Sequence, residues 1–250
     1  MKLFDLSGRT AIVTGGGSGI GRDMAHGLAE AGANLVLCAR RVERCEQVAG
    51  EVETEAIALP CDVRDPKQVH SVVEAAAERF GRVDVLVNNA GTVWGAPVAE
   101  MPLEGWQKVI DVNLTGVFLF AQAVGRAMIA DGGGGKIVNI ASVAGLGGAP
   151  PEVMDAIAYN ASKGGVIAFT RDLAVKWARY GINVNAIAPG WFPSEMSSAV
   201  LESHPELAQH IPLRRFGGRD DLKGAVVYLA SAASAFVTGH TLVVDGGQSA

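Results

Sequence analysis

The stretch AIAYNASKGG places Tyr159 and Lys163 four residues apart. If this segment is helical, the two side chains lie on one face, with Cβ atoms roughly 5–6 Å apart. A free tyrosine has a pKa of about 10, and a nearby ammonium favours its phenolate form. The spacing therefore predicts a general acid/base that exchanges a proton near neutral pH. The alternative is an ordinary Tyr–Lys pair on a solvated helix face, although the surrounding alanines and glycines would let a ligand come close.

A glycine loop follows the first expected strand. The segment TGGGSGIG (14–21) has glycines at 15, 19 and 21, which let the backbone turn tightly and approach a ligand. Free N–H groups at the start of the following helix favour a pyrophosphate. On its own this motif also fits a turn without a ligand, or the cofactor loop of a methyltransferase.

Short runs rich in β-branched residues alternate with longer segments of helical period. The expected strands are 10–14, 34–38, 56–59, 84–88, 136–141, 182–188 and 241–245. The expected helices lie near 19–31, 41–54, 66–80, 104–130, 158–180 and 220–232. Asp65 and Pro66 suit an N-cap and the first position of the third helix. Because several runs are apolar throughout, we predict one α/β domain over 1–250, a Rossmann fold with a doubly wound, seven-stranded parallel sheet flanked by helices.

Further motifs follow these strands in a fixed order. They are CDV (61–63), NNAG (88–91), Asn113, Ser142, YNASK (159–163) and PG (189–190). Together with the wide glycine spacing G-x-x-x-G-x-G, this order resembles the short-chain dehydrogenase/reductase family over essentially the whole chain. The resemblance implies an oxidoreductase that interconverts an alcohol and a ketone with a nicotinamide cofactor.

The resemblance also implies a catalytic set of four residues. Tyr159 would exchange a proton with the substrate oxygen as hydride moves, and a positively charged nicotinamide would favour its phenolate. Ser142 would hold the same oxygen. Lys163 would also bond the nicotinamide ribose, and Asn113 would help to seat a water that relays protons.

The cofactor site implied by the family draws on several segments. Asp62 would accept from the adenine amino group, and Ser194 would bond the carboxamide. Taken singly, Asp62 could be a turn residue and Asn88 an amide that braces a loop. The complete set is Gly15, Gly17, Ser18, Gly19, Ile20, Gly21, Arg40, Arg41, Asp62, Val63, Asn88, Ala90, Gly91, Tyr159, Lys163, Pro189, Gly190, Phe192 and Ser194.

The end of the second strand discriminates between the two nicotinamide cofactors. An acidic residue there would bond the ribose 2′-hydroxyl of NAD, but the sequence has Ala39, Arg40 and Arg41. A guanidinium can grip a 2′-phosphate with two hydrogen bonds. We therefore expect NADP(H) to be preferred, with NAD(H) as the second cofactor. Arg41 could equally face solvent at the start of the next helix.

Composition excludes several other functions. The net charge is −5 without a basic run, which argues against a nucleic-acid partner. Asp5 and Arg9 stand where a signal peptide would be apolar, and no uncharged apolar run reaches about 18 residues, so we expect a cytoplasmic protein without a membrane partner. Cys38, Cys45 and Cys61 suit a reducing compartment. Neither these cysteines nor the five histidines have metal-ligand spacing, and we expect no metal.

The substrate is less constrained by the sequence. The segment between Ser142 and Tyr159 is longer than usual in the family and, with Trp94 and Trp191, is expected to shape the pocket. The segment 191–216 has three prolines and predicts a lid over the substrate. Relatives are commonly homotetramers, which implies the same assembly here.

Overall similarity narrows the expected reaction. The stretches RFGGRDDLKGAVVYLAS and GHTLVVDGGQSA resemble the gluconate 5-dehydrogenase branch of the family. This implies a sugar acid or a similar polar hydroxy/keto compound as the substrate. The alternatives are a 3-oxoacyl-thioester reductase, a broad-specificity ketone reductase and, in another class, a catalytically silent NADP-sensing or scaffold protein.

Overall fold

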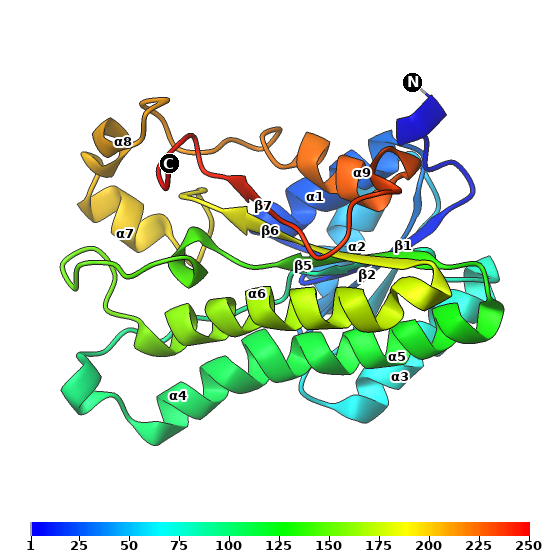
Figure 1. Cartoon of the computed structure of the whole chain (residues 1–250), viewed down its shortest axis with the longest axis horizontal. Helices are drawn as coiled ribbons and strands as arrows, with labels where there is room; N and C mark the ends of the chain where they lie inside the picture. Colours follow the sequence, from blue (N-terminus) through cyan, green and yellow to red (C-terminus); the bar gives the residue numbers. More distant parts are fainter. Residues whose placement is uncertain (1) are drawn as a thin grey trace.

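A seven-stranded parallel sheet forms the centre of the molecule in the computed structural model, which describes residues 2–250 (Figure 1). Its strand order is β3-β2-β1-β4-β5-β6-β7, and every neighbouring pair is parallel. The strands are β1 Thr10–Thr14, β2 Asn34–Ala39, β3 Ala56–Pro60, β4 Val85–Asn88, β5 Gly135–Ile140, β6 Ile182–Pro189 and β7 Thr241–Val244. The predicted doubly wound fold is confirmed, and the strand bounds agree within two residues.

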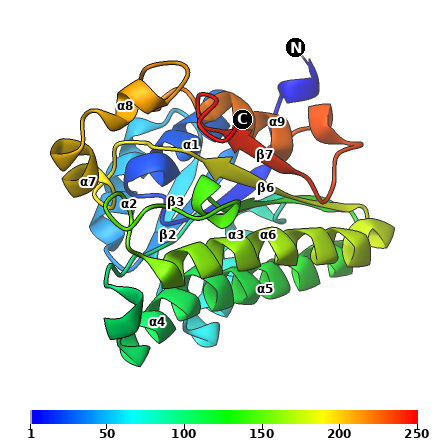
Figure 2. The same cartoon turned by 60° about the vertical axis from the view of Figure 1, so that its left-hand side comes forward.

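Helices cover both faces of this sheet (Figures 1 and 2). One face packs against α1, α2 and α9, and the other against α3, α5 and α6. Ala11 and Val13 belong to the first core cluster and Ile12 to the second, because successive residues of a strand point to opposite faces. The helices are α1 Gly19–Glu30, α2 Val42–Glu51, α3 Pro66–Phe80, α4 Leu103–Ile110, α5 Gly116–Asp131, α6 Ile157–Trp177, α7 Ser198–Ser203, α8 Leu207–His210 and α9 Lys223–Ala230.

Local sequence signals explain the ends of α3. The Asp65 side chain accepts from the backbone N–H of Lys67 at 2.9 Å, and Pro66 takes the first helical position. The helix ends at Gly81, whose φ of 82° is left-handed. The start predicted from Asp65 and Pro66 is therefore confirmed.

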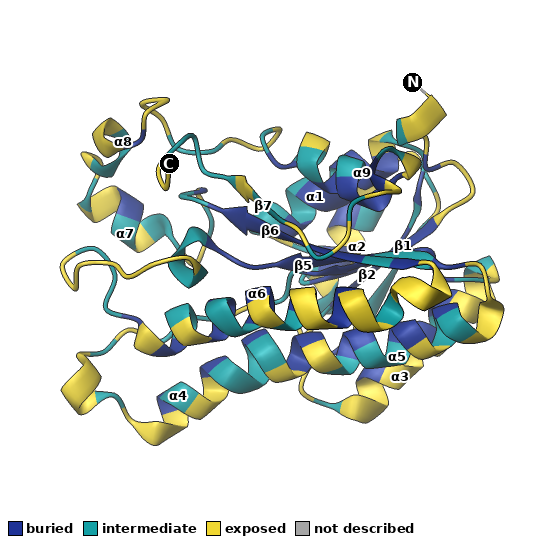
Figure 3. Ribbon diagram, viewed as in Figure 1, coloured by how far each residue is buried: buried dark blue, intermediate teal, exposed yellow. Residues whose placement is uncertain are grey.

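The long helix expected at 104–130 is interrupted. A π-helical turn, Asp111–Thr115, separates α4 from α5. The helix from Leu103 to Asp131 is long and apolar enough to cross a membrane by length and composition, with 44% of the apolar window buried. Its apolar residues Phe120, Val124 and Met128 are buried in the core against the sheet, which accounts for its hydropathy (Figure 3).

A buried polar network joins β4, β5 and α6. Asn88 Nδ2 donates to Asn139 Oδ1 at 2.9 Å, and Asn139 Nδ2 donates to Thr170 Oγ1 at 2.9 Å. Thr170 Oγ1 in turn donates to the carbonyl oxygen of Val166. Asn88 and Asn139 are direct neighbours in the β4–β5 register. Because buried amides are costly when unpaired, this series of hydrogen bonds fixes the position of α6 against the two strands.

We expect Asn139→Ala to lower the free energy of unfolding by about 2–3 kcal/mol, because it removes the shorter of the two hydrogen bonds of Asn88 Nδ2 and the donor to Thr170 Oγ1. Urea denaturation at fixed protein concentration measures this loss. Asn34→Ala is the control, since among residues 2–250 the Asn34 side chain makes no hydrogen bond, and it should cost less than about 0.5 kcal/mol. Equal losses for the two variants would contradict the role of the network.

Candidate active site and nucleotide pocket

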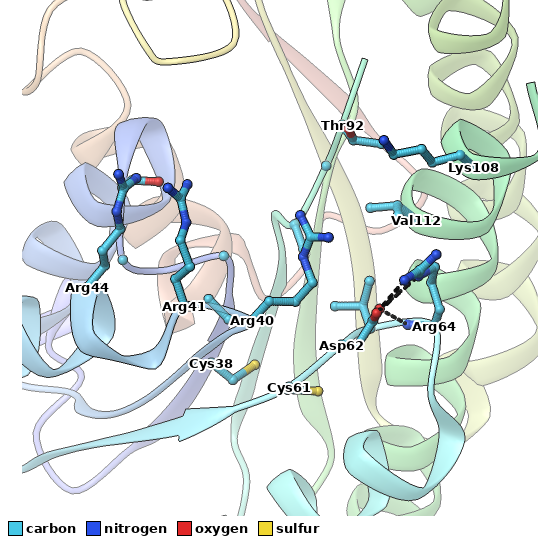
Figure 4. Close-up of a pocket in the computed structure, with 17 residues that line it drawn as sticks. Cys38, Arg40, Arg41, Arg44, Cys61, Asp62, Arg64, Thr92, Lys108 and Val112 are labelled. Atoms are coloured by element: carbon cyan, nitrogen blue, oxygen red, sulfur yellow. Dashed lines mark hydrogen bonds and ion pairs between the residues drawn. The ribbon is translucent and has the colours of Figure 1, made fainter. Parts of the chain in front are cut away.

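A pocket opens where β1 to β4 end, at the point where the strand order reverses (Figure 4). In open parallel sheets this switch point is the usual ligand site. Of the residues expected to hold a cofactor, the pocket is lined by Gly15, Gly17, Ser18, Arg40, Arg41, Asp62, Val63, Ala90 and Gly91. The structure thus brings together residues from four separate segments of the chain.

The glycine loop wraps around an amide side chain. Gly15 and Gly19 have left-handed φ angles of 65° and 52°. A Cβ on Gly21 would lie 2.3 Å from Asn89 Nδ2 and from the Gly15 carbonyl oxygen, so only glycine fits there. The loop therefore needs glycine at these positions for its own packing, and its backbone is left facing the pocket.

Thr14 and Asn89 hold the loop against the end of β4. Thr14 Oγ1 accepts from the backbone N–H of Asn89 at 3.0 Å and of Ala90 at 2.9 Å. Asn89 Nδ2 donates to the carbonyl oxygens of Thr14 at 2.9 Å and Gly15 at 3.1 Å. The predicted site set omits both residues, although both stand inside the motifs that define it.

Positive side chains lie on both sides of the pocket, with Arg41 and Arg44 opposite Arg64 and Lys108 (Figure 4). Arg44, Arg64 and Lys108 line it together with the expected Arg40 and Arg41. The sequence reasoning missed the first three, because their helices and turns reach the pocket only in the folded chain. Among residues 2–250, Arg40 forms no ion pair, whereas Arg41 and Arg44 both contact Glu195. A pocket lined by these positive side chains suits an anionic ligand with several phosphates.

Asp62 lies in the pocket and also closes a turn. Its carboxylate accepts from Arg64 Nη2 at 2.6 Å and from the Arg64 backbone N–H at 3.0 Å. The hydrogen bond from the Arg64 side chain lowers the pKa of Asp62, so the group is ionised at neutral pH. Asp62 therefore closes a turn, as the alternative interpretation of this residue predicted, and it also lines the pocket.

Several predicted cofactor residues lie outside this pocket. Asn88 is buried, and its amide joins β4 to β5 instead of bracing a loop or facing the pocket. The Phe192 ring packs against Gly217 in the core, so at most its backbone faces a ligand. Ser194 Oγ is 3.0 Å from Ser197 Oγ. The remaining members outside the lining are Gly19, Ile20, Gly21, Tyr159, Lys163, Pro189 and Gly190.

Two of the features expected to shape the substrate pocket have defined contacts in the structure. Trp94 lies against Gly105, where a Cβ would approach its ring to 2.8 Å, and Lys108 Nζ sits 5.2 Å from the Trp94 ring centroid. The tryptophan therefore covers α4. The segment after Ser142 does meet the loop after β4, because the Ala96 N–H donates to the Asp155 carbonyl oxygen at 2.9 Å.

Asn113 connects the loop after β4 to α6. It lies in the π-helical turn and is fully buried. Its Nδ2 donates to the Thr92 carbonyl oxygen at 2.9 Å and to Ser162 Oγ at 3.0 Å, and its Oδ1 accepts from the Thr92 N–H at 2.8 Å. The π-helical turn, a feature often found at functional sites, thus positions a side chain that ties two site segments together.

Ser142, Tyr159 and Lys163 converge at the carboxyl end of β5. Ser142 Oγ accepts from the backbone N–H of Ala144 at 3.2 Å, and its hydroxyl lies near the Tyr159 phenol. Lys163 Nζ lies 5.6 Å from the Tyr159 ring centroid and donates to the Ile140 carbonyl oxygen at 2.7 Å. Gly145 lets this turn lie directly on α6, because a Cβ there would come within 2.6 Å of the Lys163 backbone.

The protonation of this group differs from the expectation. Burial raises the pKa of Tyr159, and the hydrogen bond from Ser142 lowers it by less. Lys163 does not counteract the burial, because its ammonium faces Ile140 instead of the phenol oxygen. Burial also lowers the pKa of Lys163 to about 8. The protein by itself therefore keeps Tyr159 protonated at neutral pH.

The residues described show no metal centre. Within residues 2–250, no three His, Cys, Asp or Glu side chains gather closely enough to hold an ion. Cys38, Cys45 and Cys61 are free and buried.

Known proteins resemble this chain over almost its whole length. A family model described as Enoyl-(Acyl carrier protein) reductase matches residues 15–249. The chain is 38% identical to 2-dehydro-3-deoxy-D-gluconate 5-dehydrogenase of Escherichia coli K12, over 99% of this chain and 98% of the relative. It is 40% identical to a 3-oxoacyl-[acyl-carrier-protein] reductase of Synechocystis, over 97% of both chains.

Solved structures show the same likeness. A short-chain type dehydrogenase/reductase from Mycobacterium marinum superposes with a TM-score of 0.95 at 39% identity, over 99% of this chain and 98% of the other. A gluconate 5-dehydrogenase from Burkholderia cenocepacia, in complex with NADP and tartrate, has a TM-score of 0.91 at 41% identity, over 99% and 97%.

We expect the low pKa of Lys163 to appear in the pH dependence of stability. An unfolded lysine has a pKa of about 10.4, so between about pH 8 and about pH 10 the unfolded chain binds more protons than the folded one. The free energy of unfolding, measured without cofactor relative to Lys163→Met, should therefore rise by about 2 kcal/mol from about pH 7 to about pH 9.5. A constant difference across this range would show that the ammonium is not desolvated.

Proposed function

The chain belongs to the short-chain dehydrogenase/reductase family, and we propose that it is an NADP(H)-dependent oxidoreductase that interconverts a secondary alcohol and a ketone. The observation that carries the proposal is the convergence of Ser142, Tyr159 and Lys163 at the end of β5. An NADP-sensing or scaffold protein would not need this group. A cationic pocket for a phosphorylated nucleotide lies across the same edge of the sheet.

The residues present fit a nicotinamide dinucleotide phosphate. The glycine loop presents backbone to the pocket, and Arg40, Arg41 and Arg44 would hold a 2′-phosphate at the end of β2. Asp62 and the Val63 backbone would face the adenine. When bound, the nicotinamide supplies the hydride acceptor in oxidation and the hydride donor in reduction.

Tyr159 would act as the general acid/base. In the reductive direction its phenol gives a proton to the carbonyl oxygen, and in the oxidative direction its phenolate takes the alcohol proton. Ser142, whose hydroxyl lies near the Tyr159 phenol, would hold the same substrate oxygen. The protonated phenol that burial favours is the form needed for reduction.

Lys163 and Asn113 would support the proton path. An ammonium has three N–H donors, and the Ile140 carbonyl oxygen occupies one, which leaves two for the ribose and for a water. Asn113 holds the loop after β4 and the start of α6 in place beside Lys163. Its role here is positioning as much as seating the water.

A sugar acid or a similar polar hydroxy/keto compound is the substrate class we propose. The support is similarity to relatives named for gluconate-type substrates and to a gluconate 5-dehydrogenase bound to tartrate. The second candidate is a 3-oxoacyl-thioester reductase, favoured by the Synechocystis relative at 40% identity. Both candidates use the same Ser142, Tyr159 and Lys163 chemistry.

The segment 191–216 would serve as a lid over the substrate. It carries α7 and α8, which lie at the same end of the molecule as the segment between Ser142 and Tyr159 (Figures 1 and 2). Ser194 reaches the glycine loop, because a Cβ on Gly19 would be 3.2 Å from Ser194 Cβ. A lid in this position would close over both cofactor and substrate.

The exposed apolar surface fits the expected homotetramer. Leu103, Phe118 and Val175 on α4, α5 and α6 are 78%, 44% and 80% exposed. Such residues on long neighbouring helices suit contacts between subunits. We propose these helices as one of the interfaces.

An NADPH-oxidation assay should distinguish the candidate substrates. We expect turnover of 5-ketogluconate to exceed that of an acetoacetyl thioester, with the reverse order supporting the second candidate. Tyr159→Phe is the matched control, because it removes only the proton donor. This variant should abolish turnover and leave NADPH binding measurable by fluorescence. Retained catalysis by the variant would contradict the mechanism.

The unmodified protein tests the alternative class. If it binds NADPH but turns over no ketone, the protein is a sensor.

Arg40 should discriminate between the two cofactors. We expect Arg40→Leu to weaken NADPH binding by about ten- to a hundredfold, the usual loss for a charged hydrogen bond, and to leave NADH binding nearly unchanged. Arg219→Leu is the control, an exposed arginine outside the pocket. Titration of cofactor fluorescence measures both dissociation constants. Equal losses for the two cofactors would overturn the role of Arg40.

A further inference from the structure

Glu195 forms ion pairs with two arginines of the nucleotide pocket. Its carboxylate accepts from Arg41 Nη2 at 3.1 Å and also from Arg44 Nη1. Arg41 and Arg44 flank the start of α2, whereas Glu195 lies in the segment after β6, 154 and 151 residues further along the chain. This contact joins the expected lid to the wall of the pocket.

The position of Glu195 is fixed by its neighbours. The preceding residue, Ser194, lies against the glycine loop at Gly19. Ser197 Oγ donates to the Phe192 carbonyl oxygen at 2.6 Å and lies 3.0 Å from Ser194 Oγ, which closes a short turn around Glu195. The carboxylate is therefore presented at the junction of the glycine loop and the arginines.

The charge at this junction suits a competition between anions. Hydrogen bonds from Arg44 and then Arg41 lower the pKa of Glu195, so the carboxylate is ionised at neutral pH. A guanidinium recognises carboxylate and phosphate oxygens by the same hydrogen bonds. Arg41 and Arg44 can therefore bind either Glu195 or a phosphate. If both anions were bound at once, their negative charges would repel each other.

We propose that Glu195 competes with the 2′-phosphate of the cofactor for Arg41 and Arg44, and thereby sets how strongly the protein prefers NADP(H) to NAD(H). This rests on the proposed use of NADP(H). A nucleotide without the 2′-phosphate binds while the ion pairs stay in place. A nucleotide with the 2′-phosphate has to displace Glu195 or approach it against its charge. Glu195 thus weakens binding of the phosphorylated cofactor selectively.

The test uses fragments of the cofactor that cannot take part in turnover. Calorimetry would compare 2′,5′-ADP with 5′-AMP on the full chain and on Glu195→Gln, which keeps the side-chain shape and removes the charge. We expect the variant to bind 2′,5′-ADP about two- to fivefold more tightly, in proportion to the modest strength of exposed ion pairs, and 5′-AMP as before. Tighter binding of both fragments, or weaker binding of 2′,5′-ADP, would overturn the proposal.

Two further variants serve as controls. Glu202→Gln removes an exposed carboxylate of the same segment, which forms no ion pair among residues 2–250, and should leave both affinities unchanged. In an Arg41→Gln/Arg44→Gln background, Glu195→Gln should no longer tighten 2′,5′-ADP binding; a persisting gain would overturn the competition. If the unmodified protein binds both fragments equally, the NADP(H) assignment itself fails. If it prefers 2′,5′-ADP and Glu195→Gln changes nothing, only the role of Glu195 fails.

Discussion

The site depends on the hydrogen bonds that tie the end of β1 to the end of β4. The Thr14 side chain accepts from the Asn89 backbone, and the Asn89 side chain donates to the Thr14 backbone. The Asn89 amide also occupies the space beside Gly21. Parallel strands end at one edge of the sheet, but a loop at that edge has no ladder partner to hold it. The Asn89 amide supplies those bonds. It keeps the glycine loop in a shape whose outward face can accept a phosphate.

Buried polar groups then connect the neighbouring strands and helices by hydrogen bonds. Asn88, Asn139 and Thr170 fix α6 against the sheet, while Asn113 fixes the same helix to the loop after β4. These bonds position α6, and with it Tyr159 and Lys163, at the end of β5. Burial raises the pKa of Tyr159 and lowers that of Lys163, because it disfavours the charged form of each group. Shifted pKa values of this kind are typical of catalytic sites.

Much of the fold is readable because local signals and the global pattern agree. Asp65 and Pro66 define the start of α3, and uniformly apolar runs define strands that are buried on both faces. Asn88 shows the limit of motif reasoning. It belongs to a motif whose neighbours Ala90 and Gly91 line the pocket, yet it is the last residue of β4 and points into the core. Because β4 ends at Asn88, the motif runs from the buried sheet into the following loop and supplies both core and site.

The sequence by itself determined the sheet, the glycine loop and the pairing of Tyr159 with Lys163, because these follow from periodicity and from spacing within single elements. Only the tertiary structure decided what each charged group faces. It turned the Lys163 ammonium to the Ile140 carbonyl oxygen, joined Asp62 to Arg64, and brought Glu195 onto Arg41 and Arg44. The physical reason is that protonation and ion pairing depend on burial and on distances between atoms, and both are set when segments distant in sequence meet in the fold.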